Sequence, residues 1–516
     1  MEQFLSIHQD AVIGTLTMFD RIIFKGHLTR FFIGDSFAYF LAKQDVRLKE
    51  FGAYVEKSTA ELKAAVKGLA EEAGRPYRYL DVAFTKSKGQ SKEDLARAIA
   101  ADDAITDGLI CVFSTLEACV SFAVRKNSTT HKLQVVRERR KCLHFYLYYF
   151  DAECGFMHVR LQSWFPFTIQ IYINGREWLA GQLQQQGIKA ERYENCFLRI
   201  ADLAAAQELC DHFAHREWHR VLDAFARRVN SKLALVEEAG FGSYYWVIEQ
   251  CEVATDVMFK DRAHLLGIYP DLLQGALLAF SADNVLHFLG RKLYSHFQGE
   301  VNTNLKKRPE GWRIKHYMAG NWIKMYDKFS VLRIETTINN SSEFKALQVT
   351  EDKRRWVGMR KGIANIWRYY QVTTQANRRY LAALATVPLQ GEAVLELDGL
   401  CRSRTKDGRR WAKFNPISAA DCQLFAAVMA GEHLINGFRN HDLCRRLYGD
   451  PPAASPQDSK RRCARVSRLI AKLRGHGLIA KVKDARLYRV TPRGARLLSA
   501  ALRFRLEAFP KAVNAA

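Results

Sequence analysis

Alternating and continuous apolar runs predict short β-strands in the first half of the chain. Leu143–Phe150 and Phe156–Gln162 are rich in aromatic and β-branched residues and are separated by Asp151–Gly155, which is the pattern of a β-hairpin. Thr168–Ile173 predicts a third strand, and Asn174-Gly175 predicts the turn that follows it. These segments indicate an antiparallel arrangement in this part of the chain.

Helical periodicity appears on both sides of these strands. Before residue 140, the apolar strand Gly108–Phe113 follows helical patterns at Ser58–Ala73 and Lys92–Ala101, which indicates a mixed α/β region. Ala204–Asn230 is long, amphipathic and free of proline, so helices are expected through about residue 230, and residues 352–390 predict one or two basic helices.

A second hairpin is predicted near the middle of the chain. Asn321–Tyr326 and Val331–Ile338 are apolar segments joined by a tight turn. Because side chains alternate between the two faces of a strand, polar residues two apart share a face. If the first strand continues to residue 328, the polar faces of the hairpin hold Lys324, Tyr326 and Lys328 on that strand and Arg333, Glu335 and Thr337 on its partner.

The last hundred residues predict three helices, a two-stranded wing and a final helix. The helices are expected at Ile417–Ala430, Arg439–Tyr448 and Ser459–Arg474, the strands at Leu478–Val482 and Leu487–Val490, and the last helix from Thr491-Pro492. This order is typical of a winged helix.

The third of these helices carries two stripes. Val466, Leu469, Ile470 and Leu473 recur at the spacing of a buried face. The opposite stripe is basic throughout and consists of Arg461, Arg465, Arg468 and Lys472. A helix that is apolar on one side and cationic on the other suits the major groove of DNA.

Charge adds weight to this interpretation. Residues 401–516 hold 25 Lys and Arg against 8 Asp and Glu, a net charge of +17, which leaves only +7 of the total +24 for the first 400 residues. A basic region of this kind concentrates phosphate polyanions and gains free energy from counterion release. The sequence therefore predicts DNA as the partner, with RNA as a further possibility.

Together these patterns predict an α+β multi-domain protein, with a mixed α/β core, antiparallel hairpins and a C-terminal winged helix-turn-helix. The expected regions are 1–140 (α/β), 141–240 (hairpin and helices), 241–395 (central α+β domain), 396–414 (basic linker) and 415–516 (winged helix). The 11 cysteines show no metal-binding spacing, and no signal-peptide layout or long apolar run is present. We therefore expect reduced thiols, no membrane span and a cytoplasmic location.

The segment LRGHGLIAKVKDARLYRVTPRGARLL at residues 473–498 resembles the end of winged helices of the MarR transcriptional-regulator type. The resemblance covers about 100 residues. It implies binding of duplex DNA, with phosphate contacts from the wing, where Lys483 and Arg486 lie.

The pattern Tyr326-Asp327-Lys328 followed by Arg-x-Glu at 333–335 is similar to that in replication initiators of rolling-circle plasmids and filamentous phages. The resemblance covers residues 250–340. It implies a tyrosine that attacks a DNA phosphate with the help of a divalent metal, Mg²⁺ or Mn²⁺. By this resemblance Tyr326 or Tyr317 is the nucleophile, Lys328 a phosphate contact, and Asp256 and Glu335 metal ligands. We also expect Lys324 and Arg333 to contact nucleic acid.

The leading hypothesis is thus a DNA-binding protein of a mobile or plasmid-like element that acts as a strand-nicking endonuclease targeted by its C-terminal winged helix. Two alternatives stay open. One is a binder without catalysis, either a transcriptional regulator or a structured-RNA-binding protein, in which the central hairpin only packs and its charged residues form ordinary ion pairs. The other is a metal-dependent nuclease without a covalent step.

Overall fold

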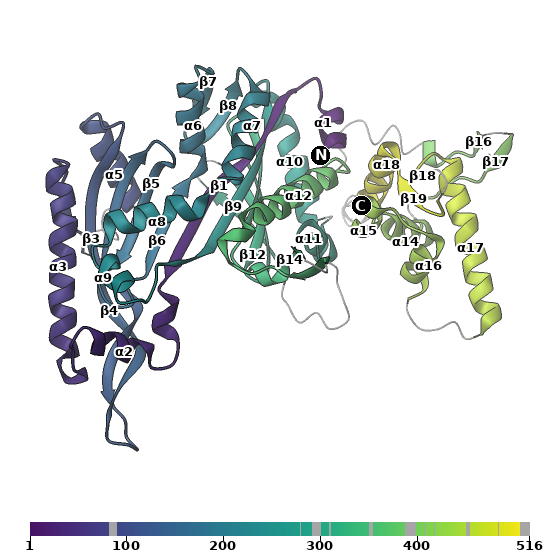
Figure 1. The fold of residues 1–516 in the computed structure, drawn as a ribbon. Helices are drawn as coiled ribbons and strands as arrows, with labels where there is room; N and C mark the ends of the chain where they lie inside the picture. The colour runs from purple at the N-terminus through teal and green to yellow at the C-terminus, as the bar shows by residue number, and fades with distance from the viewer. Residues whose placement is uncertain are drawn as a thin grey trace, which may run out of the picture.

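The structure is a computed structural model. It describes the chain except for residues 82–89, 279, 292–300, 309–310, 350–353, 388–398, 407, 417, 450–454, 483–484 and 506–516. The described part is a mixed α/β protein with one large, mostly antiparallel sheet, in agreement with the predicted α+β class (Figure 1).

The sheet has eleven strands in the order β10-β11-β12-β13-β9-β1-β6-β5-β4-β3-β2. Every neighbouring pair is antiparallel except β2 with β3. The strands are β1 (Val12–His27), β2 (Tyr77–Tyr79), β3 (Gly108–Lys126), β4 (Leu133–Asp151), β5 (Gly155–Gln162), β6 (Ile169–Asn174), β9 (Tyr245–Phe259), β10 (Val301–Arg308), β11 (Gly311–Met318), β12 (Asn321–Lys328) and β13 (Val331–Ile338). Strands from the first three predicted regions therefore lie in one continuous sheet.

The connectivity of the sheet repeats once. In the first half, β1 is followed by helices and then by the meander β3-β4-β5-β6, whose last strand returns to pair with β1. In the second half, β9 is followed by helices and by the meander β10-β11-β12-β13, whose last strand pairs with β9. The two halves join through the long antiparallel pairing of β1 with β9.

Most helices pack on one face of this sheet, which we call the helical face, whereas α5 (Lys92–Asp102) packs on the other face of the first half, around Phe113 and Tyr148. Contacts to the sheet come from α3 (Phe51–Glu72), α7 (Leu203–Ala214), α8 (Trp218–Val229) and α12 (Ile366–Leu384). Large rings fill the interface: Phe19 on β1 packs on Phe213 and Tyr370, with ring centroids 6.1 and 5.0 Å away. This apolar layer is the main core of the molecule.

The other face is polar over the second half of the sheet, and we call it the open face. Buried and half-buried residues alternate strictly along β12, so Ile323 and Met325 point to the helices while Lys324 and Tyr326 point to the open face. The short hairpin of β7 (Ala190–Tyr193) and β8 (Cys196–Ile200) lies against β9 and β13.

The remaining described elements are α1 (Glu2–Ile7), α2 (Ser36–Lys43), α6 (Gly175–Gln185), α9 (Leu233–Glu238), α10 (Arg262–Leu278), α11 (Ala282–Phe288), β14 (Lys345–Val349), β15 (Arg354–Gly358), the hairpin β16 (Arg404–Lys406) with β17 (Arg409–Trp411), and the 3-10 turns Thr29–Phe32, Leu48–Glu50, Ser341–Glu343 and Ile363–Asn365.

Several local predictions need correction. The helices expected over Ala204–Asn230 are α7 and α8, and they are separated at residues 215–217, where Arg216 binds Glu153 at 3.1 Å. Asn174 does not make a turn but caps α6, accepting hydrogen bonds from the backbone of residues 176 and 177. Asparagine suits both roles, so the sequence did not separate them. Part of the region 352–390 is a strand, β15, rather than a helix.

The C-terminal elements form a group of their own, as Figure 1 shows, and their buried residues make a second hydrophobic cluster. Its elements are α14 (Ala419–Val428), α15 (Gly431–Asn436), α16 (Asn440–Tyr448), α17 (Pro456–Gly475), β18 (Ile479–Lys481), β19 (Tyr488–Val490) and α18 (Pro492–Arg503). Leu400 and Phe414 belong to this cluster, so the predicted linker packs with it. We call the part of the chain that contains the large sheet the body. The C-terminal cluster contacts it through an ion pair between Arg446 and Asp283, 3.3 Å apart.

Within the described residues, no single helix has the length and apolar character needed to cross a membrane. One bent pair, Arg262–Leu277 with Ala282–Phe288, meets the requirement by length and composition only.

Candidate functional site

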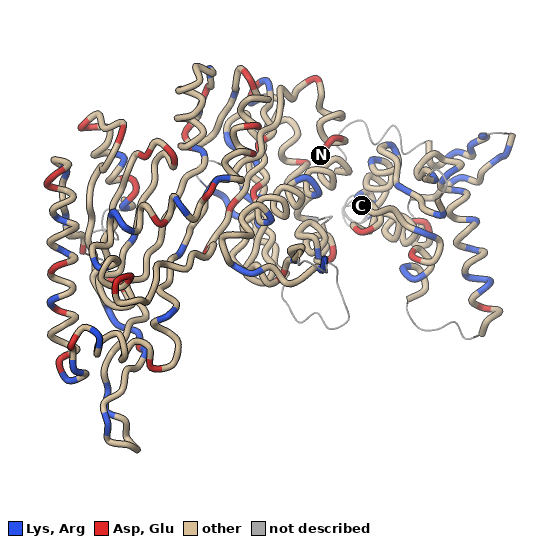
Figure 2. The backbone as a smooth tube through the Cα atoms, in the orientation of Figure 1, with Lys and Arg blue, Asp and Glu red and all other residues tan. Residues whose placement is uncertain are grey.

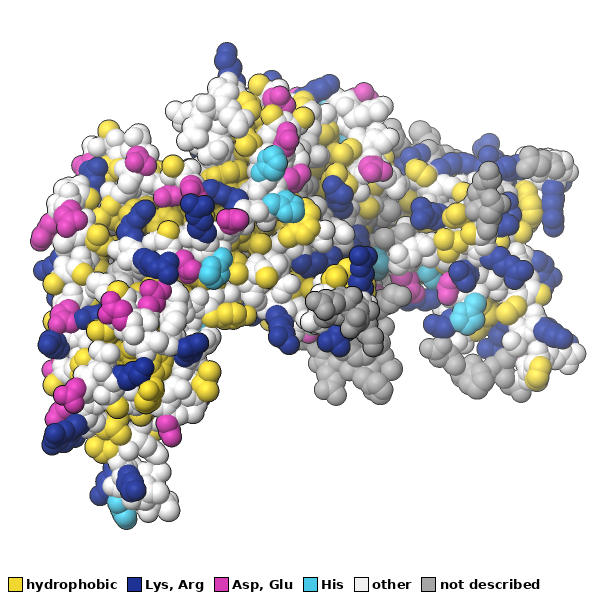
Figure 3. Space-filling view, viewed as in Figure 1, with side chains coloured by type: hydrophobic (Ala, Val, Ile, Leu, Met, Phe, Trp, Pro, Cys, Tyr) yellow, Lys and Arg dark blue, Asp and Glu magenta, His cyan; other side chains and the backbone are white. Residues whose placement is uncertain are grey.

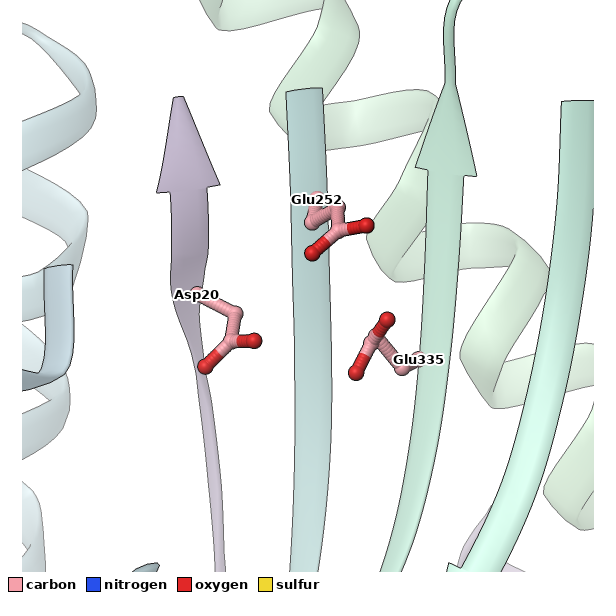
Figure 4. Close-up of side chains that lie close together, drawn as sticks. All are labelled: Asp20, Glu252 and Glu335. Atoms are coloured by element: carbon pink, nitrogen blue, oxygen red, sulfur yellow. The ribbon is translucent and has the colours of Figure 1, made fainter. Parts of the chain in front are cut away.

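Three carboxylates meet on the open face at the centre of the sheet (Figure 4). Asp20 comes from β1, Glu252 from β9 and Glu335 from β13, and one oxygen of each lies within 4.8 Å of the others. We call these residues the acidic trio. Their side chains are 13%, 5% and 3% exposed, so Asp20 provides the contact of the trio with solvent.

A β-bulge brings Asp20 into the trio. The pairing of β1 with β9 shifts between Phe19 and Arg21, which leaves Asp20 as the extra residue. A bulge reorients the side chains beside it. Phe19 therefore points to the helices, while Asp20 joins the face that carries Glu252.

A fully buried ion cluster lies beside the trio. Asp256 accepts from Arg333 Nε at 2.8 Å and Nη2 at 3.1 Å, and from Arg176 Nη1 at 2.7 Å. Arg176, at the first turn of α6, also binds Asp20. The side chains of Arg176 and Arg333 have no exposed surface. The cluster thus connects α6, β1, β9 and β13 and fixes the position of Asp20.

Two residues of β12 reach the trio directly. Tyr326 donates to Glu335 Oε2 at 2.7 Å. Lys324 binds Glu335 and lies 3.7 Å from Glu252 Oε1. The ammonium group of Lys324 therefore sits next to two carboxylates of the trio.

The pKa values of the carboxyl groups diverge. Burial opposes ionisation of Asp20, but the guanidinium groups of Arg176 and Arg333 outweigh it and lower the pKa of Asp20 to about 2. The same balance lowers the pKa of Asp256. For Glu252, burial and the adjacent charge of Glu335 raise the pKa. The site therefore holds two firmly ionised carboxylates and one that accepts a proton more readily.

Charges within the site balance. Asp20, Glu252, Asp256 and Glu335 face four cations, namely Arg21, Arg176, Lys324 and Arg333. Arg21 lies 3.8 Å from Glu252 and its side chain is 43% exposed. A divalent ion on the trio would therefore add positive charge next to Lys324, whose flexible side chain can turn toward solvent or a phosphate.

Cations continue across the open face from the trio, and all of them except Lys324, which pairs with Glu335, lack an acidic cross-strand partner. Lys315 pairs directly with Lys324, and Lys306 pairs directly with Arg313. We call these four residues the cation ladder. Burial and the charges of the other three lower the pKa of Lys315. Like charges opposite one another destabilise a sheet, so a bound polyanion would relieve this repulsion.

The other residues of the predicted central domain that were expected to act in the site have different partners in the structure. Tyr317 lies on the open face of β11, where its ring stacks on Trp322 with the centroids 6.5 Å apart. Lys328 binds Glu194 at 2.6 Å and Asn195 at 2.7 Å, in the turn between β7 and β8. Asp256 and Arg333 bind each other in the buried cluster instead of facing solvent.

On α17, three of the four predicted basic residues are exposed: Arg461, Arg465 and Arg468, which we call the α17 ridge. The predicted buried stripe is confirmed, with Val466, Ile470 and Leu473 in the core and Leu469 packed against it. Lys472 instead turns back, with its ammonium 3.8 Å from the centroid of the Phe414 ring. Figures 2 and 3 show Lys and Arg gathered over these C-terminal elements.

Two further predicted contacts belong to the wing. Arg486 is exposed, whereas Lys483 lies outside the described residues.

Sequence reasoning missed Asp20, Glu252 and Arg176. A local signal existed for two of them: Asp20 is an acid inside the apolar run of β1, and Glu252 shares the face of Asp256 by period two. Arg176 had no such signal, because only the packing of α6 beside β1 brings it to the site.

No protein-family model, curated protein or solved structure matches this chain.

Proposed function

We propose that this protein binds DNA through its C-terminal module and cleaves nucleic acid at the acidic trio with the help of Mg²⁺ or Mn²⁺. The observation that carries the proposal is the juxtaposition, on one open sheet face, of the trio with the cation ladder. Carboxylate oxygens are the ligands that these hard cations prefer, and the ladder supplies charge for the phosphates on either side of the cleaved bond.

The C-terminal module supports the binding role. Its order of helices followed by β18, β19 and α18 is the order of a winged helix, and the α17 ridge corresponds to a recognition helix. Its exposed guanidinium groups suit phosphate oxygens and guanine edges. A cytoplasmic protein of a mobile or plasmid-like element would fit this combination of DNA binding and cleavage.

The site favours hydrolysis over attack by a tyrosine. The Tyr326 hydroxyl is tied to Glu335, and burial together with the charge of Glu335 raises its pKa well above the ordinary value. This phenol stays protonated and orients Glu335. In hydrolysis a water oxygen bonds to phosphorus as the bond to the leaving sugar oxygen breaks. The trio takes the proton of the water, and a proton returns to the leaving oxygen. A bound metal ion would supply Lewis acidity and lower the pKa of that water.

Tyr326→Phe is the variant that tests this assignment. We expect cleavage to fall by about fivefold, because Glu335 loses one orienting hydrogen bond of about 1 kcal/mol. No DNA–protein adduct should survive denaturation in either protein. An adduct in the unmodified protein that disappears in Tyr326→Phe, but persists in Tyr317→Phe, would replace hydrolysis with covalent nicking. Cleavage with Mg²⁺ or Mn²⁺ and gel analysis after denaturation distinguish the outcomes.

A second candidate is a DNA binder in which the trio only stabilises the sheet. The observation in its favour is the charge balance of the site, since Lys324 already neutralises part of the trio. The two functions differ in their response to metal. A metal-binding site raises the melting temperature as Mn²⁺ is added, because the ion binds only the folded state. A purely structural cluster shows no such rise.

The α17 ridge makes a further prediction. Replacing both Arg465 and Arg468 with glutamine should weaken binding of a labelled DNA duplex by about tenfold and reduce the slope of log K against log salt by about 1.8, that is about 0.9 for each lost phosphate contact. Fluorescence anisotropy at several salt concentrations measures both quantities.

The matched control is Arg462→Gln on the same helix. Arg462 binds Asp458 at 2.8 Å and lies off the ridge, so this variant should bind as the unmodified protein does. An unchanged affinity in the double variant would contradict DNA binding by α17.

A further inference from the structure

A long two-stranded ribbon extends from the first half of the sheet. β2 pairs with β3 only as far as Ser114, and β5 pairs with β4 only from His144 onward. Beyond these points, β3 and β4 continue as a ladder from Leu116 paired with Leu143 to Lys126 paired with Leu133. We call residues 116–143 the ribbon, and Figure 1 shows its end projecting below the sheet.

The ribbon holds most of the net positive charge of the first 400 residues. Its 28 residues contain 7 Lys and Arg against 2 Asp and Glu, a net charge of +5, whereas the first 400 residues together carry +7. The rest of the body is therefore close to neutral. The corresponding hairpin of the second half, β10 with β11, closes after eight residues on each strand. The fold of each half therefore does not require a ribbon of this length or the charge that it carries.

Attachment to the body leaves a basic surface exposed. The ribbon is attached to the body past its midpoint, where Phe122 stacks on Phe37 at 4.3 Å and its carbonyl accepts a hydrogen bond from Trp164 at 3.0 Å. Arg137, Arg139 and Lys141 recur two apart on β4, so they lie in one row on the face of the ribbon that also carries Phe122. Arg137 pairs with Phe122 and lies 5.7 Å from the centroid of the Phe32 ring, yet all three cations are exposed. Arg139 and Lys141 are exposed opposite the small apolar residues Val120 and Ala118, which carry no charge to neutralise them.

The acids of the ribbon belong to its other face. Glu138 binds Arg125 at 2.8 Å and lies 3.5 Å from Arg140, and Glu117 binds Lys92 and Arg160 at 2.8 Å each. The row formed by Arg137, Arg139 and Lys141 therefore retains its charge. At the tip, Lys126 and Lys132 flank the polar, exposed residues Ser128, Thr129 and Thr130.

We propose that the ribbon is a second DNA-binding element, separate from the C-terminal module and the acidic trio, which contacts the backbone of duplex DNA through the row Arg137, Arg139 and Lys141. A two-stranded ribbon fits the major groove of B-DNA, and its hydroxyl-bearing tip reaches base edges there. The cations at two-residue spacing, roughly 6.7 Å apart, meet successive phosphates. This inference goes beyond the proposed cleavage and does not depend on it.

The test uses the full chain and a labelled DNA duplex. Replacing Arg137, Arg139 and Lys141 together with glutamine should reduce the slope of log K against log salt by about 2.7, on the basis of about 0.9 for each phosphate contact. The control replaces three exposed lysines of the neighbouring helical segment, Lys49, Lys57 and Lys63, and should leave the slope unchanged. Both variants should melt as the unmodified protein does.

A second variant changes only residues at the free end of the ribbon. Lys126 and Lys132 lie at the free end of the ribbon, so Lys126→Gln with Lys132→Gln should lower duplex affinity without any effect on melting. Unchanged slopes in both ribbon variants, with binding still lost on substitution of the α17 ridge, would overturn the ribbon proposal and leave the proposed function standing. An equal loss on single-stranded DNA of the same length would overturn the assignment to duplex DNA.

Discussion

Replacing Glu335 with glutamine should reduce metal-dependent cleavage by on the order of 100-fold or more, the scale at which one electrostatic group that stabilises developing charge is lost. Glu335 is the member of the trio that contacts both Lys324 and Tyr326. Glutamine keeps the size of the side chain and removes only its charge. The measurement is the cleavage rate of a labelled nucleic acid in Mg²⁺ or Mn²⁺.

Its matched control is Glu249→Gln on β9, the strand that carries Glu252. Glu249 is 40% exposed and lies 3.8 Å from Lys25, outside the trio. We expect full activity in this variant. Wild-type cleavage in Glu335→Gln would show that the trio is not the catalytic centre. Glu335→Gln should also lose the rise in melting temperature that Mn²⁺ produces in the unmodified protein.

Removing Asp256 should have the largest effect on stability. Asp256→Ala leaves two guanidinium groups, those of Arg176 and Arg333, buried without their shared carboxylate. Breaking a buried ion pair by removing one partner costs about 3–5 kcal/mol, because an uncompensated charge remains in a medium of low dielectric constant. Urea denaturation followed by circular dichroism measures the change.

A surface ion pair provides the comparison. Glu191 and Arg199 lie 3.9 Å apart and are 61% and 62% exposed, so Glu191→Ala should change stability by about 0–1 kcal/mol. A similarly small change in Asp256→Ala would contradict a stabilising role for the buried cluster.

Acid provides an independent check of the same cluster. The folded-state pKa values of Asp20 and Asp256 are both lowered, so their contribution to stability is present above the ordinary pKa of an aspartate. It is lost as the pH falls toward about 2, the pKa of Asp20. The acid dependence of stability should therefore be weaker in Asp256→Ala than in the unmodified protein.

Local patterns predicted the local structure well. Period-two alternation identified the hairpin of β12 with β13, and the cross-strand pairs Lys324 with Glu335 and Tyr326 with Arg333 follow from it. On α17, the spacing of Val466, Ile470 and Leu473 predicted which side of the helix is buried. In both cases one element, or two elements joined by a tight turn, contains all the information.

Local patterns could not predict which distant elements come together to form the site. The pairing of β1 with β9 joins residues more than 200 positions apart, and nothing in either strand specifies its partner. Asp20 reaches the trio only because of a bulge, and Arg176 only because α6 starts beside β1. The metal ligands inferred by resemblance therefore included Asp256, whose oxygens bind arginine, and omitted Asp20 and Glu252.

The junction between the two halves of the sheet has a genetic consequence. Asp20 belongs to the first half, while Glu252 and Glu335 belong to the second, so no fragment that ends between β6 and β9 contains a whole trio. Deletion mapping would assign the activity to neither piece. Two separately expressed pieces should regain it only when they reassociate, and compensating mutations for a defect at residue 20 should arise on the far side of the junction.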